Sequence, residues 1–247
     1  MLLSGKRVVL TGAGGGIGTA MMAALKEAGA HVVACDRAGS GLQADELVEF
    51  DITDTAQTEV AAAKIAQSPV DVLISNAGGT RVDLMEHTDT AAIQHDLQLN
   101  FTGAAVFSRA LLPAMRGRPE GAAAVFVASV NGMSHFGSPA YSAAKAGIIA
   151  WAKALATEEG KHGLRANVVA PGSVHTPAWD DRRARQPDIF AKVTALYPLG
   201  RLVSPEEVAK AAIFLASPMA SGITGTVLPV DAGLTAGNLP FIDIITA

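Results

Sequence analysis

Tyr141 and Lys145 lie four residues apart in the stretch PAYSAAKAG, a spacing that places both side chains on one face of a helix. A tyrosine with an ordinary pKa of about 10 is a poor base at neutral pH. A neighbouring ammonium favours the phenolate, and an oxidised nicotinamide nearby would add to that effect. The pair therefore predicts a tyrosine that transfers protons. The same offset separates Tyr197 from Arg201, so the spacing alone does not single out Tyr141.

Other polar residues follow apolar runs that read as strands. Ser129 ends the run AAAVFVAS, where a hydroxyl can orient a reacting oxygen. The stretch NAG at 76–78 follows the run VDVLIS, and Asn100 lies in the long helical region after it. Because parallel strands bring their carboxyl ends to one edge of a sheet, these residues are expected to converge with Tyr141.

A glycine-rich stretch, TGAGGGIG at 11–18, connects the apolar run RVVL to a predicted helix. Such a turn gathers backbone N–H groups and the positive end of a helix dipole at one point, which suits a diphosphate. The spacing T-G-x-x-x-G-x-G differs from G-x-G-x-x-G, because Ile17 stands where the third glycine belongs, and no Lys follows as in a Walker loop. A tight strand-to-helix connection would use the same glycines.

Asp36 supports the nucleotide interpretation, because it ends the second predicted strand. A carboxylate at this place can accept hydrogen bonds from the hydroxyls of an adenosine ribose. A 2′-phosphate beside it would meet like charge at a cost on the order of 4 kcal/mol at about 4 Å. The sequence therefore predicts NAD rather than NADP, although Arg37, directly after Asp36, could soften the repulsion or stack on the adenine.

Composition excludes several classes of partner. A net charge of -4 argues against a nucleic-acid footprint, which needs clustered Lys and Arg on one face. The densest basic stretch, at 182–185, follows two aspartates and is interpreted as a solvated helix face. Cys35 is the only cysteine and the six histidines lack ligand spacing, so no metal is expected. The absence of a secretory pattern and of a membrane-length apolar stretch predicts a cytoplasmic protein without a membrane partner.

Short β-branched runs alternate with helical stretches along most of the chain. Strands that are apolar on both faces and separated by helices imply a parallel sheet covered on both sides, so we expect a doubly wound, Rossmann-like α/β fold with about seven strands in a three-layer sandwich. The strands are expected at 7–10, 31–35, 47–50, 70–75, 122–129 and 165–170, and the helices at 17–28, 54–67, 89–115 and 139–159.

Nothing in the composition divides this series, so residues 1–247 are predicted to form one dinucleotide-binding and catalytic domain. The longest irregular candidate is 173–200, which mixes charges with Trp179, Phe190 and Tyr197. A segment of that length between a strand and a helix is typical of an active-site lid.

The joint order of these motifs resembles that of the short-chain dehydrogenase/reductase family, of the compact single-domain type, over essentially all 247 residues. Downstream stretches fit as well, PGSVHTP at 171–177 and ITGTVLPVDAG at 223–233. The resemblance implies that Tyr141 is the general acid/base, that Lys145 lowers its pKa and holds the nicotinamide ribose, that Ser129 binds the substrate oxygen and that Asn100 supports a water-linked proton path to Lys145. It implies cofactor contacts at Gly12, Gly15, Gly16, Ile17, Gly18, Asp36, Arg37, Asp51, Ile52, Asn76, Ala77, Gly78, Tyr141, Lys145, Pro171, Gly172, Val174 and Thr176.

The chain departs from the family pattern at two places. Asp231, Ala232 and Gly233 replace the more usual Asp-Gly-Gly, and neither Gly14 nor Gly15 supplies the Arg that often accompanies phosphate-bearing cofactors. The tail at 237–247, GNLPFIDIITA, is apolar where a frayed terminus would be polar. Together with the mean hydropathy of +0.30 and the pairing of long helices in such families, the tail predicts a homotetramer or homodimer.

The expected reaction interconverts a secondary alcohol and a ketone with NAD. The residues around the expected site suit a small hydroxylated molecule such as a sugar, polyol or hydroxy acid. A 3-oxoacyl carrier-protein reductase is the alternative enzyme, but it would ordinarily prefer NADPH, and a non-catalytic dinucleotide-sensing module is the alternative of another class. Candidate substrate residues are Arg81, Asn131, His135, His175 and Trp179, each of which could equally have a surface role.

Overall fold

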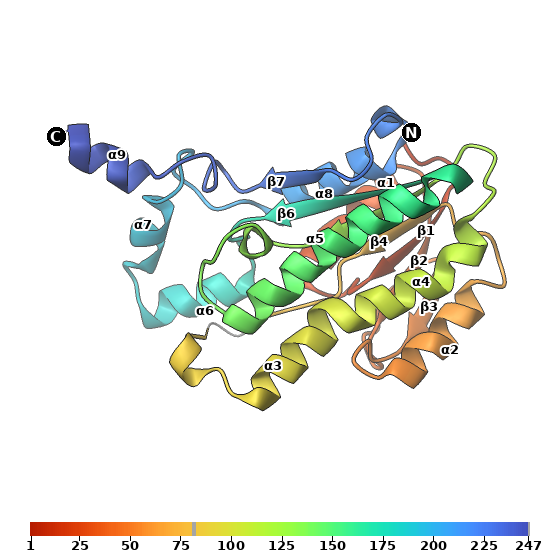
Figure 1. Cartoon of the computed structure of the whole chain (residues 1–247), viewed down its shortest axis with the longest axis horizontal. Coiled ribbons are helices and arrows are strands. Elements are labelled where there is room, and N and C mark those ends of the chain that lie inside the picture. Colours follow the sequence, from red (N-terminus) through yellow and green to blue (C-terminus); the bar gives the residue numbers. More distant parts are fainter. Residues whose placement is uncertain (81–82, 247) are drawn as a thin grey trace.

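The computed structural model describes residues 1–80 and 83–246 (Figure 1). The seven strands in these described ranges lie in one parallel sheet, in the order β3-β2-β1-β4-β5-β6-β7. Helices cover both faces, which confirms the predicted Rossmann-like fold. The strands are β1 (Arg7–Thr11), β2 (His31–Asp36), β3 (Glu46–Glu49), β4 (Val72–Ser75), β5 (Ala122–Val127), β6 (Leu164–Pro171) and β7 (Val227–Val230). The helices are α1 (Gly16–Glu27), α2 (Thr55–Ile65), α3 (Thr90–Leu97), α4 (Gly103–Met115), α5 (Pro139–Glu159), α6 (Pro177–Arg185), α7 (Ile189–Thr194), α8 (Pro205–Ala216) and α9 (Leu239–Thr246).

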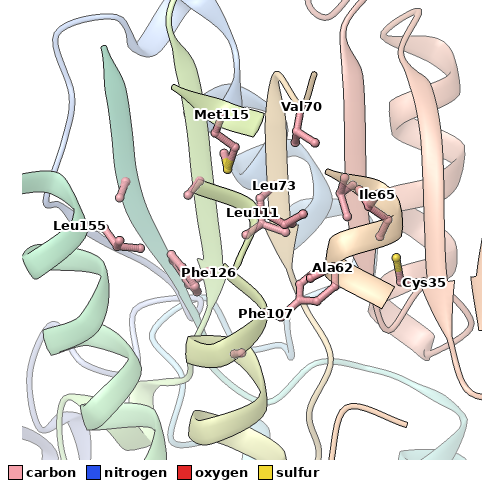
Figure 2. Packing of buried hydrophobic residues seen from close by; sticks show 14 of the residues in the cluster. Cys35, Ala62, Ile65, Val70, Leu73, Phe107, Leu111, Met115, Phe126 and Leu155 are labelled. Atoms are coloured by element: carbon pink, nitrogen blue, oxygen red, sulfur yellow. The ribbon is translucent and has the colours of Figure 1, made fainter. Parts of the chain in front are cut away.

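Alternating side chains of the strands build a separate core on each face of the sheet. Val9 of β1 points into the core beneath α2, α4 and α5, while Val8 and Leu10 point into the core beneath α1 and α8. Figure 2 shows the first of these cores, where Phe107 and Leu111 of α4 lie against the central strands. Burial on both faces explains why the strands read as continuous apolar runs.

The strand order reverses beside β1, whose two neighbours are β2 and β4. The connections from β1 to β2 and from β1 to β4 therefore leave on opposite sides, and a crevice opens at the carboxyl edge between them. The residues that end or follow β1, β2, β4, β5 and β6 meet along this edge.

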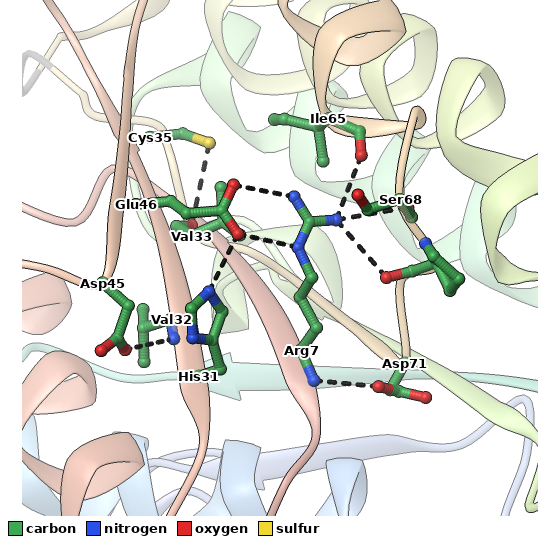
Figure 3. Close-up of polar contacts among 11 residues, drawn as sticks. Arg7, His31, Val32, Val33, Cys35, Asp45, Glu46, Ile65, Ser68 and Asp71 are labelled. Atoms are coloured by element: carbon green, nitrogen blue, oxygen red, sulfur yellow. Dashed lines mark hydrogen bonds and ion pairs between the residues drawn. The ribbon is translucent and has the colours of Figure 1, made fainter.

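The opposite, amino edge of the sheet carries an ion-pair cluster (Figure 3). Arg7 of β1 donates from Nε and Nη2 to the Glu46 carboxylate of β3 at 2.9 and 3.1 Å, and from Nη1 to the Ile65 carbonyl at the end of α2 at 3.1 Å. His31 of β2 lies 2.9 Å from Glu46 through Nε2. Glu46 thus joins β3 to both β1 and β2, and Arg7 joins β1 to the end of α2.

Several elements differ from the sequence-based expectation. The region 89–115 is not one regular helix, because a π-helical turn, Gln98–Thr102, separates α3 from α4. The segment 173–200 contains α6 and α7, and the apolar tail forms α9. None of the helices in the described ranges combines the length and the apolarity needed to cross a membrane.

Candidate active site

A cleft of about 940 Å³ runs along the carboxyl edge of the sheet. It extends from Asp36, at the end of β2, to Ser129, just after β5. These strands are three positions apart in the sheet, so the cleft spans roughly 14 Å at about 4.8 Å per strand. Of the predicted catalytic and cofactor residues, the cleft is lined by Gly12, Gly15, Gly16, Ile17, Asp36, Arg37, Asp51, Ile52, Asn76, Ala77, Gly78, Ser129, Tyr141, Lys145, Pro171, Gly172, Val174 and Thr176.

The glycine turn owes its shape to two close approaches. Gly12 has a φ of +66°, and a Cβ there would lie 2.8 Å from Ala77 Cα. Gly18, at which a cofactor contact is expected from the sequence, is not in the lining of the cleft. It is buried in α1, where a Cβ would overlap the Gly12 carbonyl. The helix begins at Gly16 after Gly15, and no side chain caps its first turn. The uncapped N–H groups therefore face the cleft and fit an anionic group such as a diphosphate.

Asp36 binds the glycine turn as well as bordering the cleft. Its Oδ2 accepts a hydrogen bond from the Gly14 N–H at 2.7 Å, and its Oδ1 accepts one from the Arg37 N–H at 2.8 Å. The carboxylate is consequently fixed at the place where an adenosine ribose would lie if the uncapped helix held the diphosphate. Further along, Asp51 Oδ1 accepts from the N–H and Oγ1 of Thr53 at 2.8 and 2.7 Å, which lowers the pKa of Asp51.

The stretch after β4 is fastened to the glycine turn. The Asn76 and Ala77 N–H groups both donate to Thr11 Oγ1 at 3.1 Å, and Asn76 Nδ2 donates to the Gly12 carbonyl at 2.9 Å. Thr11 and Asn76 thereby join the ends of the two neighbouring strands β1 and β4. This contact closes the floor of the cleft.

The π-helical turn positions Asn100 beneath the cleft rather than in its lining. The buried amide accepts a hydrogen bond from the Gly79 N–H at 3.0 Å and donates to the Gly79 carbonyl at 2.9 Å and to the Asp96 carbonyl at 3.2 Å. A Cβ at Gly78 would lie 2.7 Å from Asn100 Oδ1 and 3.2 Å from Lys145 Nζ. Asn100 and Lys145 thus meet over Gly78.

Lys145 lies on α5 one turn after Tyr141, as their spacing predicts. Its ammonium is buried and donates to the Val127 carbonyl of β5 at 2.9 Å, and it lies 5.6 Å from the centroid of the Tyr141 ring. Burial lowers the pKa of Lys145 to about 8, which leaves the amine mostly protonated at neutral pH.

The pKa of Tyr141 is shifted in opposite directions by its surroundings. Partial burial raises the pKa of its phenol, hydrogen bonding with the Ser129 side chain lowers it, and the negative charge of Asp96 raises it. The net shift is upward, opposite to the lowering expected from Lys145. Burial is the largest of these influences, and the Lys145 ammonium, 5.6 Å from the ring centroid, donates to the Val127 carbonyl.

The candidate substrate residues lie outside the lining of the cleft among the residues described, and Arg81 lies outside the described ranges. The Asn131 side chain is bonded within its own loop, and His135 is exposed. His175 Nε2 lies 3.3 Å from Asp180 Oδ1, and Trp179 packs edge to face on Phe190. These last side chains belong to the segment 173–200, close to the cleft residue Thr176 in sequence.

The cleft also contains residues that the sequence analysis missed. Phe50 and Leu99 supply apolar surface near Ile52, and His95 lies one helical turn before Leu99. The spacing of His95 and Leu99 on the helix that leads to Asn100 was the signal that could have identified them. No group of metal-ligating side chains occurs in the part of the chain that the structure describes.

Comparison with known proteins gives consistent matches along the chain. A family model described as enoyl-(acyl carrier protein) reductase matches residues 12–235. An uncharacterized oxidoreductase of Schizosaccharomyces pombe is 41% identical, covering 96% of this chain and 94% of its own length. Galactitol 2-dehydrogenase (L-tagatose-forming) of Cereibacter sphaeroides is 37% identical, covering 94% and 96%.

Two further matches are informative. A 3-oxoacyl-[acyl-carrier-protein] reductase of Escherichia coli is 35% identical, covering 95% of this chain and 99% of its own. The crystal structure of an oxidoreductase of the short chain dehydrogenase/reductase family from Burkholderia thailandensis superposes with a TM-score of 0.91 at 42% identity, covering 98% of each chain. Similarity therefore extends through both the sheet and the cleft.

Proposed function

Because the chain belongs to the short-chain dehydrogenase/reductase family, whose members bind nicotinamide dinucleotides, we propose that it is an NAD-dependent enzyme that interconverts a secondary alcohol and a ketone. The observation that carries the proposal is the single cleft that joins Asp36 at one end to Ser129, Tyr141 and Lys145 at the other. We propose a small polar hydroxylated substrate, such as a sugar, a polyol or a hydroxy acid.

The residues of the cleft fit the dinucleotide. The uncapped start of α1 would hold the diphosphate, Asp36 the adenosine ribose, and the apolar surface of Phe50, Ile52 and Leu99 the adenine. Asp36 favours NAD, because its charge would repel a 2′-phosphate and the glycine turn contains no cation to offset it. Bound NAD supplies a hydride acceptor in its nicotinamide ring.

The residues at the other end of the cleft would transfer the proton of the substrate hydroxyl. In alcohol oxidation, Ser129 orients the substrate hydroxyl and Tyr141 accepts its proton, and in ketone reduction Tyr141 returns it. Lys145 keeps a positive charge beside the phenol and, together with Asn100 at Gly78, would pass the proton toward solvent. The raised pKa of Tyr141 favours its acid form, so alcohol oxidation would need more positive charge beside the phenol than Lys145 alone provides, which bound NAD would supply.

The proposed substrate class is supported by the relative from Cereibacter sphaeroides, which is named for a polyol. The polar groups of the lid, His175 and Asp180, and the flat side chain of Trp179 suit a hydroxylated molecule if the lid closes over Ser129. The relative from Escherichia coli supports the alternative, reduction of a 3-oxoacyl carrier protein with NADPH. The charge of Asp36 opposes that alternative.

The proposal is tested by initial rates with NAD and with NADP against a panel of sugars, polyols, hydroxy acids and simple secondary alcohols. Turnover of a hydroxylated substrate with NAD is expected. Preference for NADP(H) together with turnover of a 3-oxoacyl thioester would instead establish the alternative. Binding of NADH without turnover of any panel member would favour a dinucleotide sensor.

Replacing Tyr141 by Phe separates catalysis from binding. The variant keeps the ring but loses the hydroxyl that moves the proton, so kcat should fall by about 10³-fold or more, while the Kd for NADH, measured by fluorescence titration, stays within about twofold. Tyr197→Phe is the comparison, because Tyr197 is the only other tyrosine and its hydroxyl accepts from the Ser173 N–H. Substantial turnover by the Tyr141 variant would exclude the proposed role.

A further inference from the structure

Asn131, expected from the sequence to touch substrate, is instead bonded inside the loop that connects Ser129 to α5. Its Nδ2 donates to the Gly137 carbonyl at 2.8 Å and to Ser142 Oγ at 3.1 Å. An amide nitrogen has two hydrogens, so both donors are used by these partners. The reversed amide would point its oxygen at the Gly137 carbonyl, which is repulsive. The orientation of the side chain is therefore determined by the loop itself.

The same residue holds Ser129 from two sides. The Asn131 backbone N–H donates to Ser129 Oγ at 3.2 Å, and Asn131 Oδ1 lies 3.4 Å from that oxygen. A serine hydroxyl has one proton to donate, and a partner at 3.4 Å competes for it only weakly. Tyr141 is the other polar partner of this hydroxyl, because hydrogen bonding with the Ser129 side chain lowers the pKa of the phenol.

The loop is also tied to the helix that carries the tyrosine. Ser142, one residue after Tyr141, accepts from Asn131 and donates to the Gly137 or Ser138 carbonyl at 3.0 Å. A Cβ on Gly132 would lie 2.8 Å from the backbone of Lys145, so the loop has little freedom to shift along α5. The Asn131 side chain thus links the Ser129 hydroxyl to the first turn of α5.

We propose that Asn131 is a positioning residue, which fixes the Ser129 hydroxyl relative to Tyr141 so that both hydroxyls can hydrogen bond the same substrate oxygen. This inference rests on the proposed function for its kinetic consequences, but its structural content does not. If Asn131 acts through Ser129, its loss matters only while Ser129 is present, and the ionisation of Tyr141 changes even without substrate.

The test compares Asn131→Ala with the wild type, alone and in a Ser129→Ala background. We expect kcat to fall by about 10- to 100-fold in the single variant and by less than about twofold more in the Ser129→Ala background. The Kd for NADH should stay within about twofold. Thr157→Ala is the matched control, because it removes a side-chain hydrogen bond to the Lys153 carbonyl from the far end of the same helix.

A second readout needs no turnover. The chain has two tyrosines, so the ultraviolet difference titration of wild type minus Tyr141→Phe reports the ionisation of Tyr141. Asn131→Ala should raise the midpoint, because the Ser129 hydrogen bond that favours the phenolate is weakened. If wild type turns over no substrate, the proposed function fails while this titration still tests Asn131.

Three results would overturn the inference. They are an unchanged titration midpoint, a loss of kcat as large without Ser129 as with it, and a rise in KM alone, which would make Asn131 a substrate ligand. If Asn131→Ala does not fold, Ser142→Ala removes one of the two anchors of the amide and should shift kcat and the midpoint in the same directions by smaller amounts.

Discussion

The negative charge of Asp96 affects the pKa of Tyr141. The pKa of the phenol is raised first by burial, is lowered by Ser129 and is raised again by the Asp96 carboxylate. Asp96 lies on α3, which packs against α5, and its backbone carbonyl accepts from Asn100 Nδ2. Substitution of the side chain leaves that carbonyl in place.

Asp96→Asn should therefore lower the pKa of Tyr141, because one of the charges that raise it is removed. Alcohol oxidation needs the unprotonated phenol, so the rising limb of the kcat–pH profile should move to lower pH, and ketone reduction should lose activity at a lower pH than in the wild type. The matched control is Glu86→Gln, an exposed acid-to-amide change shortly before α3. A limb that stays in place, or moves to higher pH, would contradict the prediction.

Asp36 should determine the choice of dinucleotide through its charge. Asp36→Asn keeps an acceptor for the Gly14 N–H but removes the negative charge that opposes a 2′-phosphate. The ratio of kcat/KM for NAD to that for NADP should fall by about 10²-fold or more, and further when Gly15→Arg adds a cation to the turn.

Asp51→Asn is the comparison for that experiment, because this carboxylate also lines the cleft but is bonded to Thr53. It should change the ratio by less than about threefold. Equal ratios for wild type and Asp36→Asn would show that the charge of Asp36 is not what selects the cofactor.

At the scale of elements, the ion pairs at the amino edge of the sheet should make part of the free energy of unfolding depend on pH. Hydrogen bonding with Arg7 lowers the pKa of Glu46 to about 2, from an ordinary value of 4.5, and His31 acts in the same direction. A lowered pKa means that stability is fully present above 4.5 and is lost as the pH falls toward 2.

Glu46→Gln should reduce the free energy of unfolding by up to about 1 kcal/mol near neutral pH, since the carboxylate is partly exposed. The difference from wild type should shrink at about pH 3 and disappear as the wild-type carboxylate becomes protonated. Urea unfolding followed by circular dichroism measures both values. Glu120→Gln, which removes the more exposed partner of Lys6, should cost less, and a Glu46 effect that does not vary with pH would refute the linkage.

The same scale shows why some elements were predictable. Helix α5 begins at Pro139 and ends at Glu159 as expected, because Pro suits a first helical turn and a glycine follows the last residue. The π-helical turn at Asn100 was not predictable, because its extra backbone residue leaves the apolar pattern of 89–115 nearly unchanged. Glycine spacing located the turn that lines the cleft, whereas the inward or outward direction of Asn131 and His175 depends on loop contacts that no local pattern encodes.

At the scale of the whole molecule, the apolar side chains of the carboxyl-terminal tail are exposed. Helix α9 has no buried residue, and Phe241, Ile242, Ile244 and Ile245 are 56%, 48%, 77% and 63% exposed. Figure 1 shows the helix projecting beyond the body of the protein. We propose a second copy of this chain as the partner, because burying these side chains offsets the cost of exposing them to water.

Light scattering after gel filtration should give a mass at least twice the 25.2 kDa of one chain. Ile244→Glu combined with Ile245→Glu should lower that mass or weaken association on dilution, because two charges would be buried without partners. Val60→Glu, at a position 71% exposed on α2, should leave it unchanged. A monomeric wild type would refute the proposal.

The two ends of the chain offer different opportunities for attachment. In Figure 1 the amino terminus lies near α1 and α8, whereas the carboxyl terminus extends beyond α7 on the other side of the molecule. A purification tag or an immobilising linker placed before Met1 would start away from α6 and α7. The same attachment at the carboxyl end would stand beside α7, so the orientation of the protein on a solid support depends on which end is tethered.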